Sequence, residues 1–163
     1  MELRDDVVVL RRPAPGDIDA IVAACNDSAI ARFIPLIPTP YERADAQWWV
    51  DHADELWATG SAYPFVIADA AAGGVLGAIE VRPAEGSIGY WIAAEARGRG
   101  AATRALRLVC DWRTERPLWL VTHPDNRASQ RVAEKAGFRP TGLVPHEPSF
   151  RDGTAEATRY QLD

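Results

Sequence analysis

Two arginines and two glycines, Arg97-Gly98-Arg99-Gly100, lie between an expected strand and an expected helix. The segment reads Gly89-Tyr-Trp-Ile-Ala-Ala-Glu-Ala-Arg97-Gly-Arg-Gly100-Ala-Ala-Thr103 and opens into an amphipathic stretch. The start of a helix exposes backbone N–H groups without partners and the positive end of the helix dipole, which together favour a phosphate. Arg97 and Arg99 add fixed positive charge and forked donors at the same place. The segment therefore predicts a site for an anionic cofactor that carries phosphate.

The glycine spacing argues against a dinucleotide as that cofactor. Gly98-x-Gly100-x-x-Thr103 lacks the third glycine of the dinucleotide-binding pattern. That pattern also expects an acidic residue about 20 positions further on, at the end of the next strand. Here the next expected strand, Leu118 to Thr122, ends without one. The motif also follows an expected antiparallel meander rather than a βαβ unit.

Two motifs resemble the GNAT superfamily of N-acetyltransferases. The spacing Arg97-x-x-Gly100-x-Ala102 resembles the loop with which that superfamily holds the pyrophosphate of acetyl-CoA. A second, downstream motif resembles the superfamily's helix that begins at an Asn and ends at Glu-Lys-x-Gly-Phe. It reads His123-Pro-Asp-Asn126-Arg-Ala-Ser129-Gln-Arg-Val-Ala133-Glu-Lys-Ala-Gly137-Phe138. The resemblance runs from about Val7 to the C-terminus. It implies a transferase (an acyltransferase) that moves an acetyl group from acetyl-CoA to a primary amine by direct attack in a ternary complex.

The resemblance also implies where the cofactor lies. In that superfamily two central strands splay apart, and the strand 87–92 would supply backbone partners to the pantetheine arm around Trp91 and Ile92. Its N–H groups would polarise the thioester carbonyl. Asn126 would bind the arm, a role compatible with capping its helix. The pyrophosphate would be held by Arg97, Gly98, Arg99, Gly100, Ala101, Ala102 and Thr103. Gly89 is expected either at a bulge where the strands diverge or as a packing glycine.

The expected proton donor differs from that of most members of the superfamily. Many carry a tyrosine seven positions after the Asn, where this chain has Ala133. Ser129 stands in place of the usual alanine three after the Asn, an exchange that resembles the branch of ribosomal-protein N-terminal acetyltransferases acting on alanine and serine N-termini. The resemblance makes the Ser129 hydroxyl the donor to the coenzyme A sulfur. The alternative is a bond from Ser129 to a backbone carbonyl inside its helix.

A base or water chain must take a proton from the attacking amine. Glu80 is the candidate, because a carboxylate in the middle of a strand is unexpected unless it is used or paired. Its alternative is a surface or edge-strand glutamate paired with Arg82. His123 could also serve, although a lone histidine is more often structural. In the superfamily that this chain resembles, the region of the first two helices walls the acceptor cleft, which implies that Trp48 and the loop Pro35–Pro40 do so here. The alternatives for Trp48 are partner binding and a half-buried place in the core.

These residues need a scaffold that the apolar pattern outlines. Helical periodicity and turn residues predict the order βααβββαβαββ, which matches the GNAT fold. The fold class is α/β (α+β), with a mixed, mostly antiparallel sheet of about seven strands and helices on both faces. A chain of 163 residues is expected to form one N-acetyltransferase domain over residues 1–163.

The composition argues against several classes of binding partner. The net charge of −5 argues against nucleic acid, and no apolar run is long enough for a membrane. The N-terminus lacks a secretion signal, and Cys25 and Cys110 are expected as buried free thiols rather than a disulfide or metal pair, so a cytoplasmic protein without a metal is predicted. A monomer and a homodimer both remain open.

The sequence does not name the acceptor amine. A protein N-terminus, an aminoglycoside and a small metabolic amine are all compatible with it, so an antibiotic-detoxifying enzyme is one alternative. Another is a non-catalytic acyl-CoA binding or sensing domain, which would keep the phosphate loop and need no acid or base.

Overall fold

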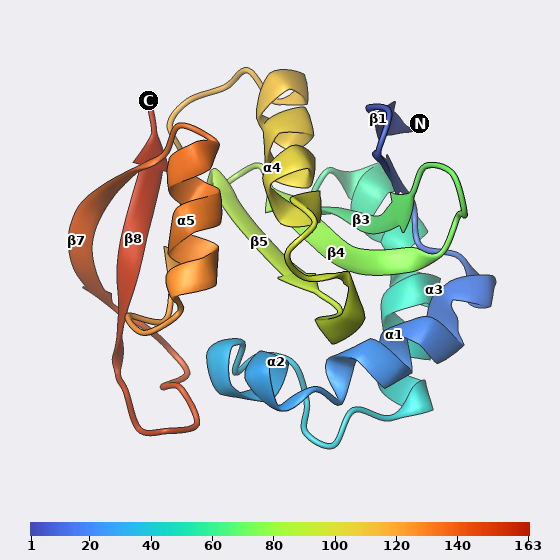
Figure 1. Ribbon diagram of the computed structural model, residues 1–163, viewed down its shortest axis with the longest axis horizontal. Coiled ribbons are helices and arrows are strands. Elements are labelled where there is room, and N and C mark those ends of the chain that lie inside the picture. The colour runs from blue at the N-terminus through green and yellow to red at the C-terminus, as the bar shows by residue number, and fades with distance from the viewer.

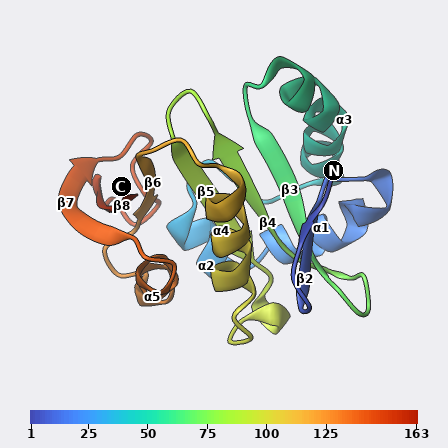
Figure 2. The same cartoon turned by 90° about the horizontal axis from the view of Figure 1, so that it is seen from above.

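One sheet of eight strands runs through the molecule, in the order β1-β2-β3-β4-β5-β6-β8-β7. The computed structural model describes residues 1–163, and its arrangement is seen in Figures 1 and 2. The strands are β1 (Leu3–Arg4), β2 (Val8–Arg11), β3 (Tyr63–Asp69), β4 (Val75–Arg82), β5 (Ser87–Ile92), β6 (Leu118–Thr122), β7 (Arg139–Pro145) and β8 (Glu156–Leu162). The helices are η1 (Pro15–Asp17), α1 (Ile18–Cys25), α2 (Ser28–Phe33), α3 (Arg43–Thr59), η2 (Ala94–Ala96), α4 (Ala101–Trp112) and α5 (Arg127–Lys135).

The predicted meander is confirmed, and the predicted element order holds except that three α-helices, α1 to α3, precede the meander where the order had two, and that the sheet has one strand in addition. Strands β2 to β5 pair antiparallel with their sequence neighbours, and Gly73 and Gly86 take positive φ angles of 79° and 74° in the turns between them. The addition is β1, a two-residue strand that pairs Leu3 with Leu10 of β2. It makes the sheet eight strands wide, where about seven were expected. Two residues are too few for the alternation that marks a strand in a sequence.

Helices cover both faces of the sheet and enclose separate cores (Figure 2). On one face, side chains of α4 such as Leu106 and Val109 pack with Phe65 and Ile67 of β3. On the other face, α1 and α3 pack against Val66 and Ala68 of the same strand. Because successive strand residues point to opposite faces, β3 is buried on both and reads as a continuous apolar run.

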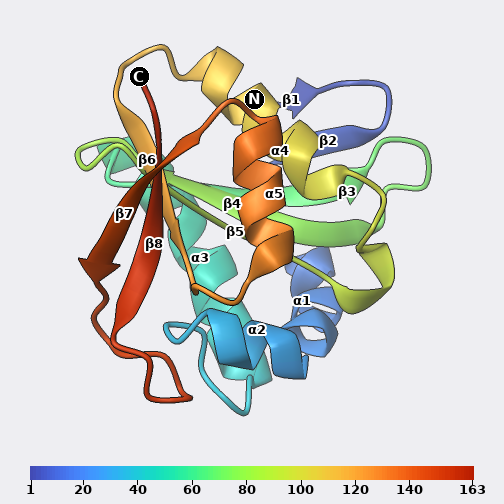
Figure 3. The ribbon, with the colours of Figure 1, turned by 60° about the vertical axis from the view of Figure 1, so that its left-hand side comes forward.

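The sheet opens in its middle, between β5 and β6. These parallel strands are paired only at Ser87 and Trp119, where the Trp119 N–H donates to the Gly86 carbonyl at 2.8 Å. Past that point they run apart (Figure 3). The Ala93 N–H donates to Leu76 of β4, so strand alternation turns the backbone groups of Tyr90 and Ile92 toward the gap.

Both cysteines lie in the cores as free thiols, as predicted. Cys25 of α1 is 3% exposed and Cys110 of α4 is 6% exposed. Burial raises the pKa of the Cys25 thiol to about 12 and that of Cys110 to about 11. None of the helices combines the length and the apolarity that crossing a membrane needs.

One buried hydroxyl in the sheet has no hydrogen-bond partner. Thr122, at the end of β6, is 4% exposed, and its Oγ1 contacts no donor or acceptor. Burying a hydroxyl without a partner costs about 1–3 kcal/mol. We therefore expect Thr122→Val, which replaces the hydroxyl with a methyl of similar size, to raise the free energy of unfolding by roughly 1 kcal/mol. Urea denaturation measures this.

The matched control for that substitution is Thr158→Val on β8, the cross-strand neighbour of Thr122. Thr158 is only half-buried, so its hydroxyl keeps access to water and its loss should leave stability nearly unchanged. Equal effects at the two positions would show that β-propensity, and not the unpaired hydroxyl, governs the result.

Candidate active site

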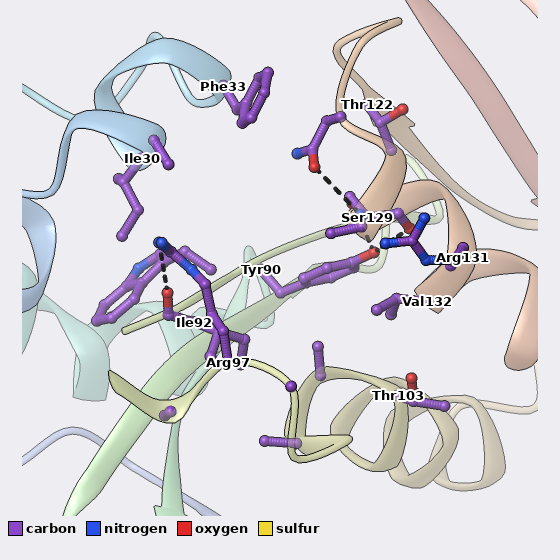
Figure 4. Close-up of a pocket in the computed structure, with 18 of the residues that line it drawn as sticks. Ile30, Phe33, Tyr90, Ile92, Arg97, Thr103, Thr122, Ser129, Arg131 and Val132 are labelled. Carbon is purple, nitrogen blue, oxygen red and sulfur yellow. Dashed lines mark hydrogen bonds between the residues drawn. The ribbon is translucent and has the colours of Figure 1, made fainter. Parts of the chain in front are cut away.

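A cleft of about 440 Å³ lies where β5 and β6 run apart (Figure 4). Its walls come from β5 and β6, from the start of α4, from α5 and from α2. The α2 wall is apolar, with Ile30 and Phe33 labelled in Figure 4. The cleft is thus built by five elements that are spread over the chain from α2 to α5.

The predicted phosphate loop forms one end of this cleft. Gly98 and Gly100 have φ angles of 78° and 76°, a region that favours glycine, and Gly100 is the N-cap of α4. No side chain caps this helix, so the N–H groups of its first turn are left to a ligand or to water. Gly98, Gly100, Ala101, Ala102 and Thr103 all line the cleft.

The two arginines of the loop lie differently from each other. Arg97 lines the cleft, and its Nη2 donates to Asp27 at the start of α2 (2.6 Å) and to the Ile92 carbonyl (3.1 Å). The Arg97 hydrogen bond is the largest cause that lowers the pKa of Asp27. Arg99 donates to the Glu95 carbonyl at 2.8 Å and does not line the cleft. The expectation that Arg99 binds the cofactor stays a prediction, which this conformation does not favour because the guanidinium folds back onto its own turn.

Ser129 lies at the cleft with both its backbone and its side chain held. Asn126, the N-cap of α5, accepts a hydrogen bond from the Ser129 N–H at 3.2 Å. The Ser129 hydroxyl lies 2.9 Å from the Tyr90 hydroxyl of β5. The Ser129 hydroxyl is not bonded to a carbonyl of its own helix, so the bond that the alternative expected is not formed, and the role of Ser129 as donor stays a prediction. Tyr90 and Ser129 face each other across the splay (Figure 4).

A second cleft, of about 620 Å³, lies on the other face of the sheet. Its floor is formed by the residues of β4 and β5 that point away from α4, and its walls include the loop after α2 and the segment between β7 and β8. The two clefts share five residues, which mark the point where they meet: Phe33, Ile34, Tyr90, Trp91 and Val121. The two clefts therefore adjoin at the gap in the sheet.

A sequence model described as "Acetyltransferase (GNAT) domain" matches residues 8–139. That range covers the phosphate loop, the splayed strands and all of α5. The chain belongs to the GNAT acetyltransferase family. The resemblance expected from two motifs is thus confirmed.

Solved structures share the GNAT fold over nearly the full chain. A RimL ribosomal L7/L12 α-N-protein acetyltransferase in complex with coenzyme A has a TM-score of 0.85 at 16% identity, covering 99% of this chain and 97% of that one. A putative ribosomal-protein-serine acetyltransferase from Vibrio cholerae has 0.81 at 16%, with the same coverage. The microcin C7 self-immunity acetyltransferase MccE, bound to acetyl-CoA and AMP, has 0.82 at 16%, covering 97% and 93%. No curated protein sequence matches the chain.

Family membership gives the reaction and its acyl donor. The protein is an acetyl-CoA-dependent N-acetyltransferase, which transfers an acetyl group to an amine. This favours a catalytic protein over the alternative of a non-catalytic acyl-CoA sensing domain. The residues present fit the donor: an uncapped helix start suits a pyrophosphate, and the unpaired edge of β5 suits the amides of the pantetheine arm.

Glu80 lies on the floor of the second cleft. It faces that cleft, as a base would, and it is also paired with Arg82, as the alternative expected. Its side chain is 24% exposed, and its Oε1 accepts from Arg82 Nε at 3.0 Å. Glu80 belongs to a central strand, so it is not an edge residue. Its carboxylate therefore faces the cleft while it is paired.

Two expectations for this cleft are corrected. Pairing of β4 with β5 is continuous through Gly89, and a Cβ at that residue would meet nothing within 4 Å, so Gly89 neither forms a bulge nor packs against a neighbour. Trp48 is 57% exposed, stacks on His52 and lines neither cleft. The tryptophan that α3 contributes to the cleft wall is its neighbour Trp49, beside Trp91 and Trp119 from the sheet. The 100° step between adjacent helix residues explains why Trp48 and Trp49 point apart.

His123 holds the end of β6 to the β7–β8 segment. It is 1% exposed, its Nδ1 accepts from the Asp125 N–H at 2.9 Å, and its Nε2 lies 2.8 Å from Asp152 Oδ2. The imidazole packs between Phe33 and Phe150, with ring centroids 5.2 and 4.6 Å away. Because both ring nitrogens are engaged and the ring lines neither cleft, the structure favours the structural role over that of a base.

We expect His123→Ala to destabilise the fold by about 2–4 kcal/mol, because it leaves a cavity between two aromatic rings. Urea denaturation measures the loss. His146→Ala is the matched control: that imidazole stacks on Phe150 from a more exposed position, and its removal should cost less. If His123 were the base, the variant would instead keep its stability and lose turnover.

Sequence reasoning missed several residues at the first cleft. Arg131 and Lys135 of α5 line it, and neither side chain is in an ion pair. The sequence did contain a pattern that predicts them, because one helix face, with spacing i, i+3, i+4, i+7, carries Ala128, Arg131, Val132 and Lys135. Tyr90 was missed because nothing in the local pattern relates a strand residue to a helix 39 positions later.

Proposed function

We propose that the acceptor is the α-amino group of a peptide or protein that begins with serine or alanine. The observation that carries this proposal is the position of the Ser129 hydroxyl in the first cleft, 2.9 Å from the hydroxyl of Tyr90, which lines both clefts, in the sequence context that resembles the ribosomal-protein branch. The shared fold of two acetyltransferases with names of that branch is consistent with it. An open second cleft of about 620 Å³ leaves room for several residues of an extended peptide.

For the donor, we place the pyrophosphate of acetyl-CoA on the backbone from Gly98 to Thr103. Arg97 supports that loop by tying it to Asp27, and Arg131 supplies a free guanidinium from α5. The pantetheine arm would pair with the open edge of β5, at the backbone of Tyr90 and Ile92, and with Asn126. Trp91 contributes through its side chain on the acceptor side, because its backbone groups face β4.

The protons are assigned to two residues on opposite faces of the sheet. Acetyl-CoA supplies the acetyl group as a thioester, whose sulfur leaves as a thiolate once the amine has attacked. The Ser129 hydroxyl would donate a hydrogen bond to that sulfur and so stabilise its developing negative charge. Glu80 would take the proton of the amine, directly or through water, from the floor of the acceptor cleft. The acid and the base are thus separated by the sheet.

The charges of the second cleft disfavour an aminoglycoside as the acceptor. Such polycations need several uncompensated carboxylates, whereas Arg82 and Arg159 lie in this cleft beside its glutamates. Arg82 is paired with Glu80, and the Arg159 guanidinium stacks over the ring of Trp119, 4.5 Å from its centroid. A polypeptide N-terminus carries a single positive charge and avoids this repulsion.

The test is release of coenzyme A thiol from acetyl-CoA with a panel of acceptors. The panel contains peptides that begin with Ser, Ala, Lys or Glu, the same Ser peptide with its N-terminus blocked, an aminoglycoside and spermidine. We expect turnover with the Ser and Ala peptides and none with the blocked peptide. Turnover confined to the aminoglycoside or spermidine would overturn the proposed acceptor.

A further inference from the structure

The Tyr90 hydroxyl makes a contact that the proposed chemistry has not used. It lies 2.9 Å from the Ser129 hydroxyl oxygen and 3.2 Å from the Ser129 carbonyl oxygen, in position to donate to either. Tyr90 lies on β5 and Ser129 on α5, so this contact spans the splayed strands (Figure 4). Both residues line the cleft assigned to the donor.

The Tyr90 and Ser129 hydroxyls can form two hydrogen-bonding arrangements, which differ in where the two protons point. A phenol has one proton to donate and a serine hydroxyl has one. If Tyr90 donates to the Ser129 hydroxyl oxygen, the Ser129 proton is free to point into the cleft. If Tyr90 donates to the Ser129 carbonyl, the Ser129 hydroxyl donates its hydrogen bond to the Tyr90 oxygen. Its proton then does not point into the cleft. Only the first arrangement gives the sulfur a donor.

We propose that Tyr90 is a positioning residue, which orients the Ser129 hydroxyl so that its proton faces the thioester sulfur. This inference rests on the proposed role of Ser129. The Asn126 side chain fixes the Ser129 backbone, and Tyr90 fixes the side-chain rotamer. A tyrosine thus acts at this site from strand β5, although the helix position where other family members carry one is Ala133.

Tyr90 orients the serine and does not surrender its proton. Burial raises the pKa of Tyr90 to about 12, whereas a thiol ordinarily titrates near 8.5. A phenol with the higher pKa keeps its proton in the presence of a thiolate. Because a raised pKa preserves the neutral phenol, the arrangement persists through neutral and mildly alkaline pH, and Tyr90 should add no limb to the pH–rate profile there.

The test compares Tyr90→Phe, Ser129→Ala and the double variant, with the Ser-initiated peptide and saturating acetyl-CoA. We expect kcat to fall roughly 10-fold in Tyr90→Phe and roughly 100-fold in Ser129→Ala. The double variant should match Ser129→Ala, because Tyr90 acts only through that serine. The KM for acetyl-CoA should change little in Tyr90→Phe.

Tyr160→Phe is the matched control. The Tyr160 hydroxyl also donates to a residue of α5, Glu134, at 3.4 Å, but Tyr160 lines neither cleft. If Tyr90 merely anchored α5, both tyrosine variants would lose activity to a similar extent. We expect Tyr160→Phe to keep the wild-type kcat.

A second measurement is independent of turnover. Three-bond NMR couplings of the Ser129 β-protons report whether its side chain holds one rotamer. We expect one rotamer in the wild type and in Tyr160→Phe, and averaging in Tyr90→Phe. A single rotamer in Tyr90→Phe, or losses that multiply in the double variant, would overturn the positioning role and leave that of Ser129 intact. Full activity in Ser129→Ala would overturn the role of Ser129 and, with it, this inference.

Discussion

Gly100→Ala is expected to weaken acetyl-CoA binding at least about 100-fold, since a side chain at this N-cap blocks the close approach of the pyrophosphate to the backbone. The φ of 76° also makes alanine strained there, at a cost of about 1–2 kcal/mol that a folded domain tolerates. Thermal-shift titration measures the outcome. At about 100 times the wild-type Kd, the ligand stabilises the wild type by roughly 2.7 kcal/mol, and a 100-fold weaker variant by only about 0.4 kcal/mol.

The matched control is Gly73→Ala in the turn between β3 and β4. Gly73 has a φ of 79°, and, as at Gly100, an added Cβ would meet nothing within 4 Å. The two variants should therefore lose similar stability from backbone strain, while only Gly100→Ala loses the ligand-induced shift. If both variants bind acetyl-CoA alike, the pyrophosphate lies elsewhere and the placement of the donor on α4 is wrong.

Glu80→Gln is expected to lower kcat/KM for the peptide acceptor roughly 100-fold, the usual contribution of a general base. Glutamine preserves the shape of the side chain and can still accept the hydrogen bond from Arg82, so the fold and the KM for acetyl-CoA should change little. Steady-state kinetics with the acceptor varied measures the loss. The reason for the effect is that glutamine cannot take a proton from the amine.

Glu85→Gln provides the comparison for that experiment. Glu85 lines the same cleft, but it lies in the turn before β5 and accepts a hydrogen bond from the Ser87 hydroxyl at 3.0 Å. Its loss should leave kcat/KM close to the wild-type value. Wild-type kinetics in Glu80→Gln would show that Glu80 only pairs with Arg82 and is not the base. Equal losses in both variants would show that the total negative charge of the cleft, and not Glu80 alone, governs the rate.

Much of the fold and half of the site could be predicted from the sequence, because they depend on local patterns. Positive-φ glycines, a helix start without a capping side chain and apolar periodicity all act within a few residues. They located the loop from Gly98 to Thr103, the α5 start at Asn126 and the buried thiols. The short β1 strand and the fold-back of Arg99 escaped prediction, since neither leaves a periodic signal.

The sequence alone indicated the family and its acyl donor through two motifs, and it proposed residues to carry the chemistry. Only the tertiary structure decided which of those residues meet. Tyr90 reaches Ser129 and Arg97 reaches Asp27 across 39 and 70 positions of chain, and the two clefts join where β5 leaves β6. The physical reason is that periodicity fixes the face on which a side chain lies, whereas its contacts depend on strand register and on how far the sheet opens.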